Sequence, residues 1–427
     1  MVKINHSILI KNGRVIDPAN GVDEISDVLI VDNHIAAVHP SIEFEAHQTI
    51  DATGKIVAPG FIDMHVHLRE PGQEYKEDFV SGTRAAAAGG FTTVATMPNT
   101  TPVVDSGPLV EAMNDLAKEV GVVNIKIIGA VTKGQKGEQL ADLAEMKTAG
   151  AVAFSDDGHF IDSAKIFLNA LDYVKPLDKL IICHEEETTL VKGGSMNESL
   201  NSTRLGLKGR PTIAEDIAIA RDCLLADYSG GRVHFAHVSS ARSVDIIRAT
   251  KARGVRVSAE CTPQHLTLTD DIVDASNAVT KINPPLRSQA DCEALLAGLL
   301  DGTIDCLVTD HSPHAFYEKE FPYDQAPSGF PGLETSLAVM LTELVNKNKM
   351  PIGLLIEKMT SAPAKLFGLD AGTLSVGATG DVVIFDPTLE WTVDAAKFQS
   401  KAKFSPFDGR KLVGKVTNTI VRGNIVF

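Results

Sequence analysis

Apolar residues recur with two different spacings along the chain, and the two spacings predict two kinds of structure. In the middle, short apolar runs of strand length alternate with amphipathic stretches of helix length, such as residues 107–120 and 240–253, each followed directly by a glycine. The candidate strands end at His67, Thr96, near Val131, and at Ser155, His184, His237, Glu260 and Asp310. Eight strands separated by helices predict parallel pairing, and their number favours an α/β fold of the (β/α)8 TIM-barrel type over a doubly wound sheet.

Both ends of the chain carry short alternating strands separated by turn residues. Residues 12–13 and 32–33 each predict a hairpin near the N-terminus. Residues 380–386 indicate a strand, and residues 415–427 indicate a closing hairpin. Neither end has enough strands to be stable alone, so we expect one small β-sandwich domain built from both termini rather than two independent units. The expected domains are residues 1–57 together with 371–427 and, inserted between them, a barrel of residues 58–370.

The composition narrows the class of protein further. The chain has 427 residues, of which 44% are hydrophobic, a formal net charge of −15 and a sequence pI of about 5.3. Such an acidic chain does not indicate a nucleic-acid partner or an anionic membrane partner, and we expect neither. Five cysteines without a C-x-x-C pair, no apolar leader at the N-terminus and no membrane-length apolar run predict reduced thiols and a cytoplasmic location. No G-x-G-x-x-G follows the first barrel strand, which argues against a dinucleotide site.

The strongest candidates for chemistry lie where the predicted barrel strands end. Alternate residues of a strand share a face, so His65 and His67 can point at one metal ion. The C-terminal ends of barrel strands line the active site, which brings other polar residues to the same mouth. These are Asn99 after the second strand, Asp156 and Asp157 after the fourth, His184 after the fifth, His237 after the sixth, and Asp310, His311 and His314 after the eighth. Four histidines and two aspartates suit two Zn²⁺ ions that share a bridging carboxylate and a bridging hydroxide.

Several stretches resemble the dihydroorotase family, in its long bacterial form, within the cyclic amidohydrolases. They are residues 60–78, 88–93, 97–100, 155–158 and 310–314. The resemblance covers essentially the whole chain and implies interconversion of N-carbamoyl-L-aspartate and L-dihydroorotate in pyrimidine biosynthesis. It implies that His65, His67 and Asp310 hold one metal ion, that His184 and His237 hold the other, and that Asp157 bridges them, with Asp156 as the alternative bridge. It also implies that Asp310 is the catalytic general acid and base.

The resemblance further implies a set of residues that contact the substrate. Arg69, Asn99 and His314 are expected to hold its α-carboxylate, and Asn283, Ser328 and Gly329 to lie near the ring. His67 and Leu68 complete the expected substrate-binding set. An arginine offers a planar fork for a carboxylate, which agrees with this role. Ring closure turns two carboxylates into one and consumes a proton. We therefore expect lower pH to favour ring closure and higher pH to favour hydrolysis.

Two alternative functions remain open at this stage. A hydantoinase, dihydropyrimidinase or allantoinase would resemble this chain, but those enzymes bridge their metals with a carbamylated lysine, and the fourth strand here ends in aspartates. The other alternative is a non-catalytic homologue that acts as a partner of aspartate transcarbamoylase, although such a chain would be expected to lose metal ligands. A homodimer is expected, and a complex with the transcarbamoylase is a further possibility that the sequence does not decide.

Other polar residues near these motifs receive simpler interpretations. Residues 315–332, rich in Pro and Gly, predict a long loop over the barrel mouth that is either a lid or a passive surface loop. Residues 185–187 are expected to be a solvated helix start, and Asp63 is expected to orient a ligand rather than to bind metal. The remaining histidines are expected to lie on the surface, to pack, or to support the site: His6, His34, His39, His47, His159, His234, His265 and His311.

Overall fold

The computed structural model describes residues 6–427 and contains the predicted barrel. Its strands are β6 (Phe61–Val66), β7 (Phe91–Thr96), β8 (Asn124–Gly129), β9 (Ala153–Ser155), β10 (Ile181–Cys183), β13 (Val233–Phe235), β14 (Val257–Cys261) and β15 (Cys306–Leu307). Neighbouring strands pair in parallel in the order β15-β14-β13-β10-β9-β8-β7-β6. The eight strands therefore occur where the sequence predicted them, within three residues at their C-terminal ends.

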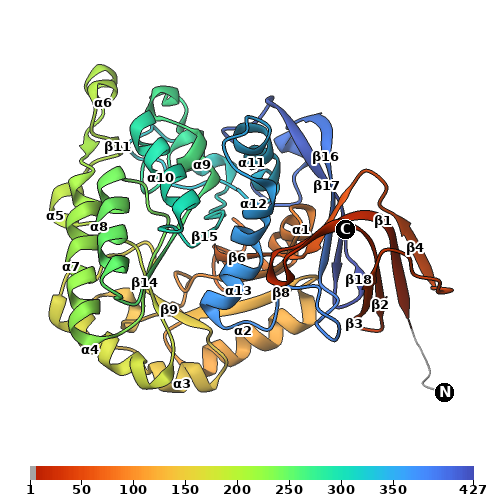
Figure 1. Cartoon of the computed structure of the whole chain (residues 1–427). Helices are drawn as coiled ribbons and strands as arrows, with labels where there is room; N and C mark the ends of the chain where they lie inside the picture. The colour runs from red at the N-terminus through yellow and green to blue at the C-terminus, as the bar shows by residue number, and fades with distance from the viewer. Residues whose placement is uncertain (1–5) are drawn as a thin grey trace.

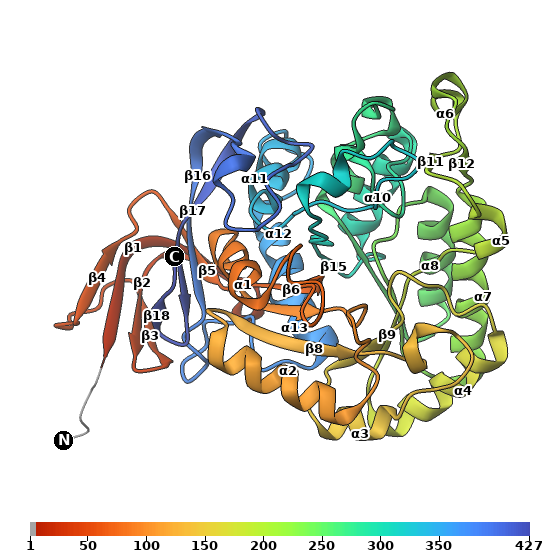
Figure 2. The ribbon, with the colours of Figure 1, turned by 180° about the vertical axis from the view of Figure 1, so that it is seen from behind.

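Helices surround the barrel strands (Figures 1 and 2). They are α1 (Phe79–Ala88), α2 (Gly107–Val120), α3 (Leu143–Thr148), α4 (Ala164–Val174), α7 (Ile213–Ser229), α8 (Ala241–Ala252), α10 (Gln289–Asp301), α12 (Ile352–Met359) and α13 (Ser361–Phe367). Shorter helices occur in the connections: α5 (Thr188–Val191), α6 (Leu200–Leu205), α9 (Pro263–Thr267) and α11 (Ser336–Met340). The predicted helix at 107–120 is confirmed, and the one at 240–253 is confirmed with one residue fewer at each end. In α2 the buried residues Val110, Met113 and Ala117 form the apolar face that the periodicity indicated.

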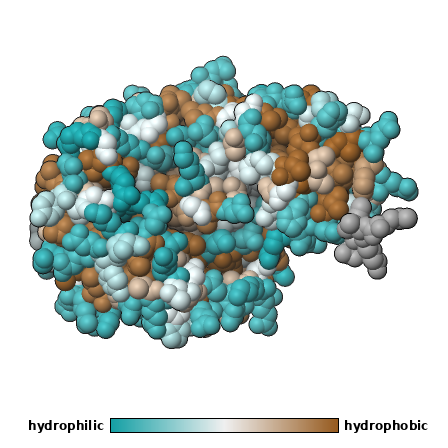
Figure 3. Space-filling model, turned by 60° about the horizontal axis from the view of Figure 1, so that its bottom comes forward, coloured by the Kyte–Doolittle hydropathy of each residue, from teal (hydrophilic) through white to brown (hydrophobic). Residues whose placement is uncertain are grey.

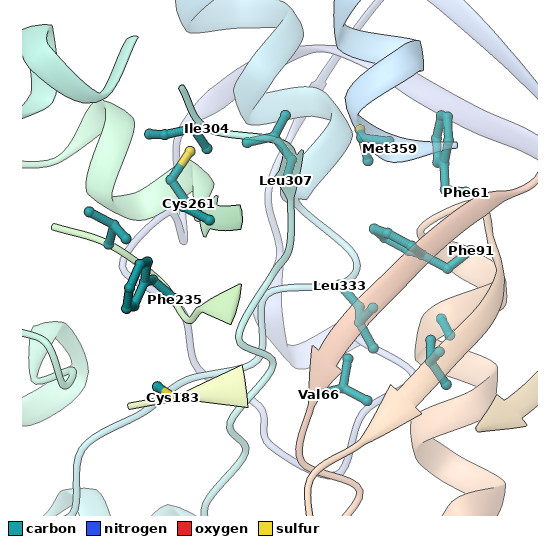
Figure 4. Packing of buried hydrophobic residues seen from close by; sticks show 14 of the residues in the cluster. Phe61, Val66, Phe91, Cys183, Phe235, Cys261, Ile304, Leu307, Leu333 and Met359 are labelled. Atoms are coloured by element: carbon teal, nitrogen blue, oxygen red, sulfur yellow. The ribbon is translucent and has the colours of Figure 1, made fainter. Parts of the chain in front are cut away.

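The main hydrophobic core fills the space around the barrel strands. Phe61 and Phe91 lie on neighbouring strands with their rings 5.8 Å apart in an edge-to-face arrangement, and Figure 4 shows them close to Met359. Phe235 is another member of the same core, which also contains Leu307. Burial of each side chain of this size contributes about 1.5–3 kcal/mol, so this core holds the strand ends in fixed positions.

Both termini contribute strands to one mixed sheet that forms the β-sandwich domain, as predicted. The strands are β1 (Ser7–Asp17), β2 (Val22–Val31), β3 (His34–His39), β4 (Gln48–Asp51), β5 (Ile56–Pro59), β16 (Val382–Thr392), β17 (Lys411–Val421) and β18 (Asn424–Ile425). The N-terminal β5 lies between β1 and the C-terminal β16, so neither end completes the sheet alone. The sheet encloses its own small core, which includes Ile10, Val28 and Ile384.

The hairpin predicted at Asn12 and Gly13 is wrong. Residues 7–17 are a single strand, and its register against β2 shifts between Ile10 and Gly13, which marks a β-bulge. Asn12 takes a left-handed φ of 63°, and its backbone N–H donates to Asp27 Oδ1 over 2.9 Å. An Asn-Gly pair suits a bulge as well as a turn, and pairing with a long neighbouring strand decides between them. The second predicted hairpin, β2–β3, and the closing hairpin, β17–β18, are confirmed.

Two further features of the molecule stand outside the barrel and the sandwich. A short arm of β11 (Met196–Asn197), α6 and β12 (Gly209–Arg210) projects at the end away from both termini (Figure 1). The face in Figure 3 shows polar residues interspersed with apolar ones. Among residues 6–427, no helix has both the length and the apolar character needed to cross a membrane.

Candidate metal centre and active site

The ends of five barrel strands bring six predicted ligands into one buried cluster. His65 lies on β6 and His67 follows it, while Asp157, His184 and His237 follow β9, β10 and β13. Asp310 follows β15. All six side chains are at least 90% buried. Side chains that lie far apart in the sequence meet here because parallel strands of a barrel end at the same face.

Asp157 lies at the centre of this cluster. Its Oδ1 lies 3.4 Å from His65 Nε2, 3.6 Å from His184 Nδ1 and 3.5 Å from His237 Nε2. Its Oδ2 lies 3.5 Å from His67 Nε2, and Asp310 Oδ1 lies 3.2 Å from the same nitrogen. One carboxylate oxygen therefore faces His65, His184 and His237 and the other faces His67, so this carboxylate contacts members of both predicted ligand sets, as one shared between two ions would.

The chemistry of these donors fits metal ions. His65 Nε2 and Asp157 Oδ1 are buried and have no hydrogen-bond partner within residues 6–427, although buried polar atoms nearly always have one. Ligand atoms of His65, His67 and Asp310 lie within 4.8 Å of one another, and so do those of His65, Asp157 and His237. Imidazole nitrogens and carboxylate oxygens are the donor atoms that Zn²⁺ prefers, together with thiolate.

The electrostatics of the cluster keep the central carboxylate ionised. Burial alone would raise the pKa of Asp157, but His65, His184 and His237 outweigh burial and hold that pKa well below its ordinary value. Burial would lower the pKa of His184, but Asp157 and Glu186 outweigh it and raise that pKa to about 10. Metal binding to such an imidazole displaces its proton, as coordination through nitrogen requires.

The neighbouring aspartate, Asp156, points away from the cluster. Its Oδ1 accepts hydrogen bonds from the backbone N–H groups of Val131, over 2.8 Å, and Thr132, over 3.0 Å. Its Oδ2 accepts from the hydroxyl of Thr132. The structure therefore places Asp157, and not Asp156, among the histidines.

A carboxylate that the sequence analysis did not single out lies beneath the cluster. Glu260 Oε1 lies 2.6 Å from His65 Nδ1, and Glu260 Oε2 lies 3.0 Å from His234 Nε2. This contact fixes the ring of His65 so that its other nitrogen faces Asp157. His234, which was expected only to pack or to support the site, therefore helps to hold Glu260. A glutamate within a fully buried strand was the signal that could have identified it, because such a residue needs partners.

Asp63 joins the first and last barrel strands. Its Oδ1 accepts from the backbone N–H of His65 and its Oδ2 from that of Thr309, both over 3.0 Å. Burial raises the pKa of Asp63 to about 7. The residue contacts the backbone of a candidate ligand rather than the cluster itself.

Arg69 and His314 lie together beside the cluster. Arg69 donates to Pro313 O over 3.1 Å and to Ser312 Oγ over 2.9 Å, and its Nη2 lies 3.4 Å from His314 Nε2. Burial lowers the pKa of His314 to about 3, so this imidazole is neutral and can lie next to the arginine without charge repulsion. Arg69, His237 and Asp310 have positive φ angles of 62°, 30° and 49°. Such backbone conformations in non-glycine residues cluster at functional sites.

The other expected substrate contacts are distributed around the same mouth. Asn99 Oδ1 lies 2.9 Å from His67 Nδ1, and Asn283 Nδ2 lies 3.0 Å from His184 Nε2. The Ser328 carbonyl oxygen lies 2.8 Å from His314 Nε2, and the Gly329 N–H donates to Lys281 O. The side chain of Leu68 instead belongs to the hydrophobic core, which leaves only its backbone for a substrate contact.

One expectation for this region is wrong. Residue 185 of the acidic run 185–187 is not solvated: Glu185 is buried beside Asp222, and burial is the main cause that raises its pKa well above the ordinary value. Of the three, Glu187 is the N-cap of α5, and its carboxylate accepts a hydrogen bond from the N–H of Leu190. Strand geometry explains the difference, because Glu185 follows β10 on the side opposite to His184. His6, His34, His39, His47 and His159 lie outside the cluster, and His265 packs between Thr262 and Pro284.

Solved structures share this fold over nearly the whole chain. An L-hydantoinase (dihydropyrimidinase) from Arthrobacter aurescens matches with a TM-score of 0.89 and 31% identity, over 99% of this chain and 96% of that one. A dihydropyrimidinase from Brevibacillus agri NCHU1002 matches with a TM-score of 0.87 and 25% identity, over 98% of this chain and 95% of that one.

The barrel, the β-sandwich built from both termini and the His/Asp cluster together define the class of protein, an amidohydrolase enzyme. A family model described as "Dihydro-orotase-like" matches residues 54–243, and a dihydroorotase from Citrifermentans bemidjiense is 50% identical over 422 residues, 99% of each chain. A dihydroorotase from Pelotomaculum thermopropionicum is 50% identical over 419 residues, 98% of each chain. The chain belongs to the dihydroorotase family.

Proposed function

We propose that this chain catalyses the reversible closure of N-carbamoyl-L-aspartate to L-dihydroorotate in pyrimidine biosynthesis. The observation that carries this proposal is a buried cation beside the cluster that makes no direct ion pair within residues 6–427. Arg69 is 7% exposed, yet it forms no ion pair with any residue among 6–427. A buried unpaired charge is costly, and an α-carboxylate of the substrate would neutralise it.

The position of Arg69 suits a substrate that carries such a carboxylate. Burial lowers the pKa of Arg69 only to about 10, so the guanidinium is charged at neutral pH. The fork-shaped guanidinium can bind both oxygens of a carboxylate, the neutral His314 lies 3.4 Å from it, and Asn99 is proposed as a further contact. A plain hydantoin or dihydrouracil has no carboxylate to place there, which favours the dihydroorotase reaction over that of the structural relatives.

The six clustered side chains are proposed to hold two Zn²⁺ ions. His65, His67 and Asp310 would bind one ion and His184 and His237 the other, with Asp157 and a hydroxide shared between the two. When bound, such ions lower the pKa of water towards neutrality and polarise the amide carbonyl.

Asp310 is proposed to move the proton in both directions. In hydrolysis its carboxylate accepts the proton of the attacking water and delivers it to the departing ring nitrogen, and in ring closure it does the reverse. Its Oδ1 lies 3.2 Å from His67 Nε2 and 3.7 Å from His65 Nε2, at the edge of the cluster. These contacts with the two histidines support a fixed position of the carboxylate beside the proposed ions.

An assay of the purified chain with zinc tests the proposed function. N-carbamoyl-L-aspartate at about pH 6 and L-dihydroorotate at about pH 8 should both be converted, because closure consumes a proton and opening releases one. Hydantoin and dihydrouracil serve as control substrates, and turnover of these in preference to dihydroorotate would favour a hydantoinase. A chain that binds zinc but converts none of the four substrates would contradict catalysis and favour a structural role.

Further proposals concern the protein in the cell. We propose that residues 1–57 with 371–427 and residues 58–370 act as the two domains, that the enzyme works in the cytoplasm, and that it forms a homodimer. A complex with aspartate transcarbamoylase is an additional proposal. Sedimentation of the chain with and without the transcarbamoylase would test both assemblies.

A further inference from the structure

The backbone of the first barrel strand meets the segment that follows the last strand at His311. Strand β15 ends at Leu307, and the closing contacts lie beyond it. Val66 forms a parallel bridge with His311, and the backbone N–H of His67 donates to His311 O over 2.8 Å. This closure point therefore lies between two candidate metal ligands, because His67 is bonded to it and Asp310 precedes it in the chain.

The side chain of His311 is held by a buried carboxylate outside the cluster. His311 Nε2 lies 3.3 Å from Oε2 of Glu77, and both residues are fully buried. Glu77 precedes α1, and Ser81 of that helix donates its hydroxyl to Glu77 Oε1. The ring of His311 is thus fixed to the connection between the first two barrel strands.

Glu77 is held in turn by the C-terminal part of the chain. Ser400, which lies between β16 and β17, donates its hydroxyl to Glu77 Oε2 over 2.5 Å, and the Lys401 N–H donates to Oε1 over 3.2 Å. The Ser400 N–H donates to Glu334 Oε1 over 3.1 Å, so Ser400 is itself anchored. The segment between β16 and β17 is therefore connected to His311 at the barrel closure through the buried side chains of Ser400 and Glu77.

We propose that Ser400, Glu77 and His311 are positioning residues that fix the closure point and thereby keep Asp310 and His67 in register. None of the three belongs to the cluster, so they act through backbone placement. This inference rests on the proposed roles of Asp310 and His67. A displacement of about 1 Å at a reacting group can cost about 10²-fold in rate, so a fixed closure point matters more to turnover than to folding.

Ser400→Ala tests the proposal, with Ser405→Ala as a matched control. Both serines are buried in the same segment and both hydroxyls accept a backbone N–H two residues ahead, but only Ser400 contacts Glu77. We expect Ser400→Ala to lower kcat about tenfold with little change in KM, and to lose zinc more readily to a competing chelator. Ser405→Ala should keep both properties at the wild-type level.

Glu77→Gln provides a second variant if Ser400→Ala folds poorly. It keeps the shape of the side chain but removes its charge, and we expect the same loss of kcat and of zinc retention. Wild-type kcat and zinc retention in either folded variant would overturn the proposal. An inactive wild-type chain would instead contradict the proposed function, and the zinc-retention comparison would still decide whether the three residues position the ligands.

Discussion

At the scale of single residues, two adjacent aspartates show how strongly the direction of a side chain decides its role. Asp157 faces the four candidate histidine ligands, whereas Asp156 binds backbone N–H groups and the hydroxyl of Thr132. Neighbouring residues of an extended segment point in opposite directions, so only one of the two can reach the cluster. The same reasoning separates His184 from Glu185.

Asp157→Asn and Asp156→Asn should therefore differ in their effects. Asp157→Asn removes the negative charge among the histidines that the proposed metal ions would need, and we expect loss of zinc binding and at least about a 10²-fold loss of kcat. Asp156→Asn should keep zinc and most of the activity while lowering the melting temperature, because it weakens the bonds to Val131 and Thr132. Zinc content and kinetics of the two proteins check this, and equal loss of zinc in both would contradict the assignment.

Arg69→Lys should damage substrate use although it keeps the charge. A lysine lacks the fork that binds both oxygens of a carboxylate, and we expect kcat/KM to fall by about tenfold or more. Zinc content should not change, since Arg69 is outside the His/Asp cluster. Steady-state kinetics with both substrates check the prediction, and an unchanged kcat/KM would place the α-carboxylate elsewhere.

At the scale of elements, the loop of residues 315–332 is partly packed rather than fully exposed. It contains a short 3-10 helix, Phe316–Lys319, and buries Tyr323, Ala326 and Phe330. Lys319 donates to Pro327 O over 2.8 Å and Lys281 donates to Ala326 O over 2.6 Å, so two buried lysine side chains anchor the segment that carries Ser328 and Gly329. Whether the loop closes on substrate remains a prediction.

Lys319 should make stability depend on pH. Burial, with help from Lys281, lowers the pKa of Lys319 from 10.5 to about 7. Between these values the unfolded chain binds a proton that the folded chain lacks, so burial of this amine destabilises the fold most below pH 7 and not at all above pH 10.5. Relative to that of Lys319→Met, the free energy of unfolding of the wild type should increase by on the order of 2 kcal/mol between about pH 7 and pH 9.5.

Urea unfolding of both proteins at the two pH values measures this difference. Lys349→Met, at an exposed lysine, is the control and should follow the wild type at both pH values. A difference between wild type and Lys319→Met that does not vary with pH would show that Lys319 has the same pKa in the folded and unfolded chain.

At the scale of the whole molecule, the barrel and the sandwich are parts of one packed body. The main core contains Ile16 and Ile56 from the N-terminal strands, Phe385 and Val421 from the C-terminal strands, and the barrel residues. Phe385 contacts Phe61 with ring centroids 6.1 Å apart. The sandwich therefore stabilises the base of the first barrel strand, whose other end carries His65.

Removal and return of metal should affect both stability and activity. A chelator should lower the melting temperature and abolish turnover, because ligands that bind only the folded state stabilise it. Zinc alone should restore both, without bicarbonate, since a carboxylate bridge needs no CO₂ to form. Calorimetry and assays of the rebuilt protein test this. A strict need for bicarbonate, or a carbamylated lysine found by mass spectrometry, would contradict the role of Asp157.

The sequence by itself determined the fold class and the members of the ligand cluster. Alternating apolar runs and amphipathic stretches identify eight strands with helices between them, because each element must bury its own face. The barrel topology then brings all strand ends to one mouth, so the sequence alone groups His65, His67, His184, His237 and Asp310. Local pattern and simple topology were sufficient for this part.

Only the tertiary structure decided the contacts between residues that lie far apart in the sequence, because the spacing of residues along the chain does not determine them. Glu260 supports His65 only because closure of the barrel brings β14 near β6, although the two residues are 195 positions apart, and Ser400 reaches Glu77 across 323 residues of sequence. The Asn12-Gly13 pair became a bulge, and Glu185 became buried, because neighbouring strands and helices set their surroundings. Local sequence permits more than one conformation at such positions, and the packing of distant segments determines which one forms.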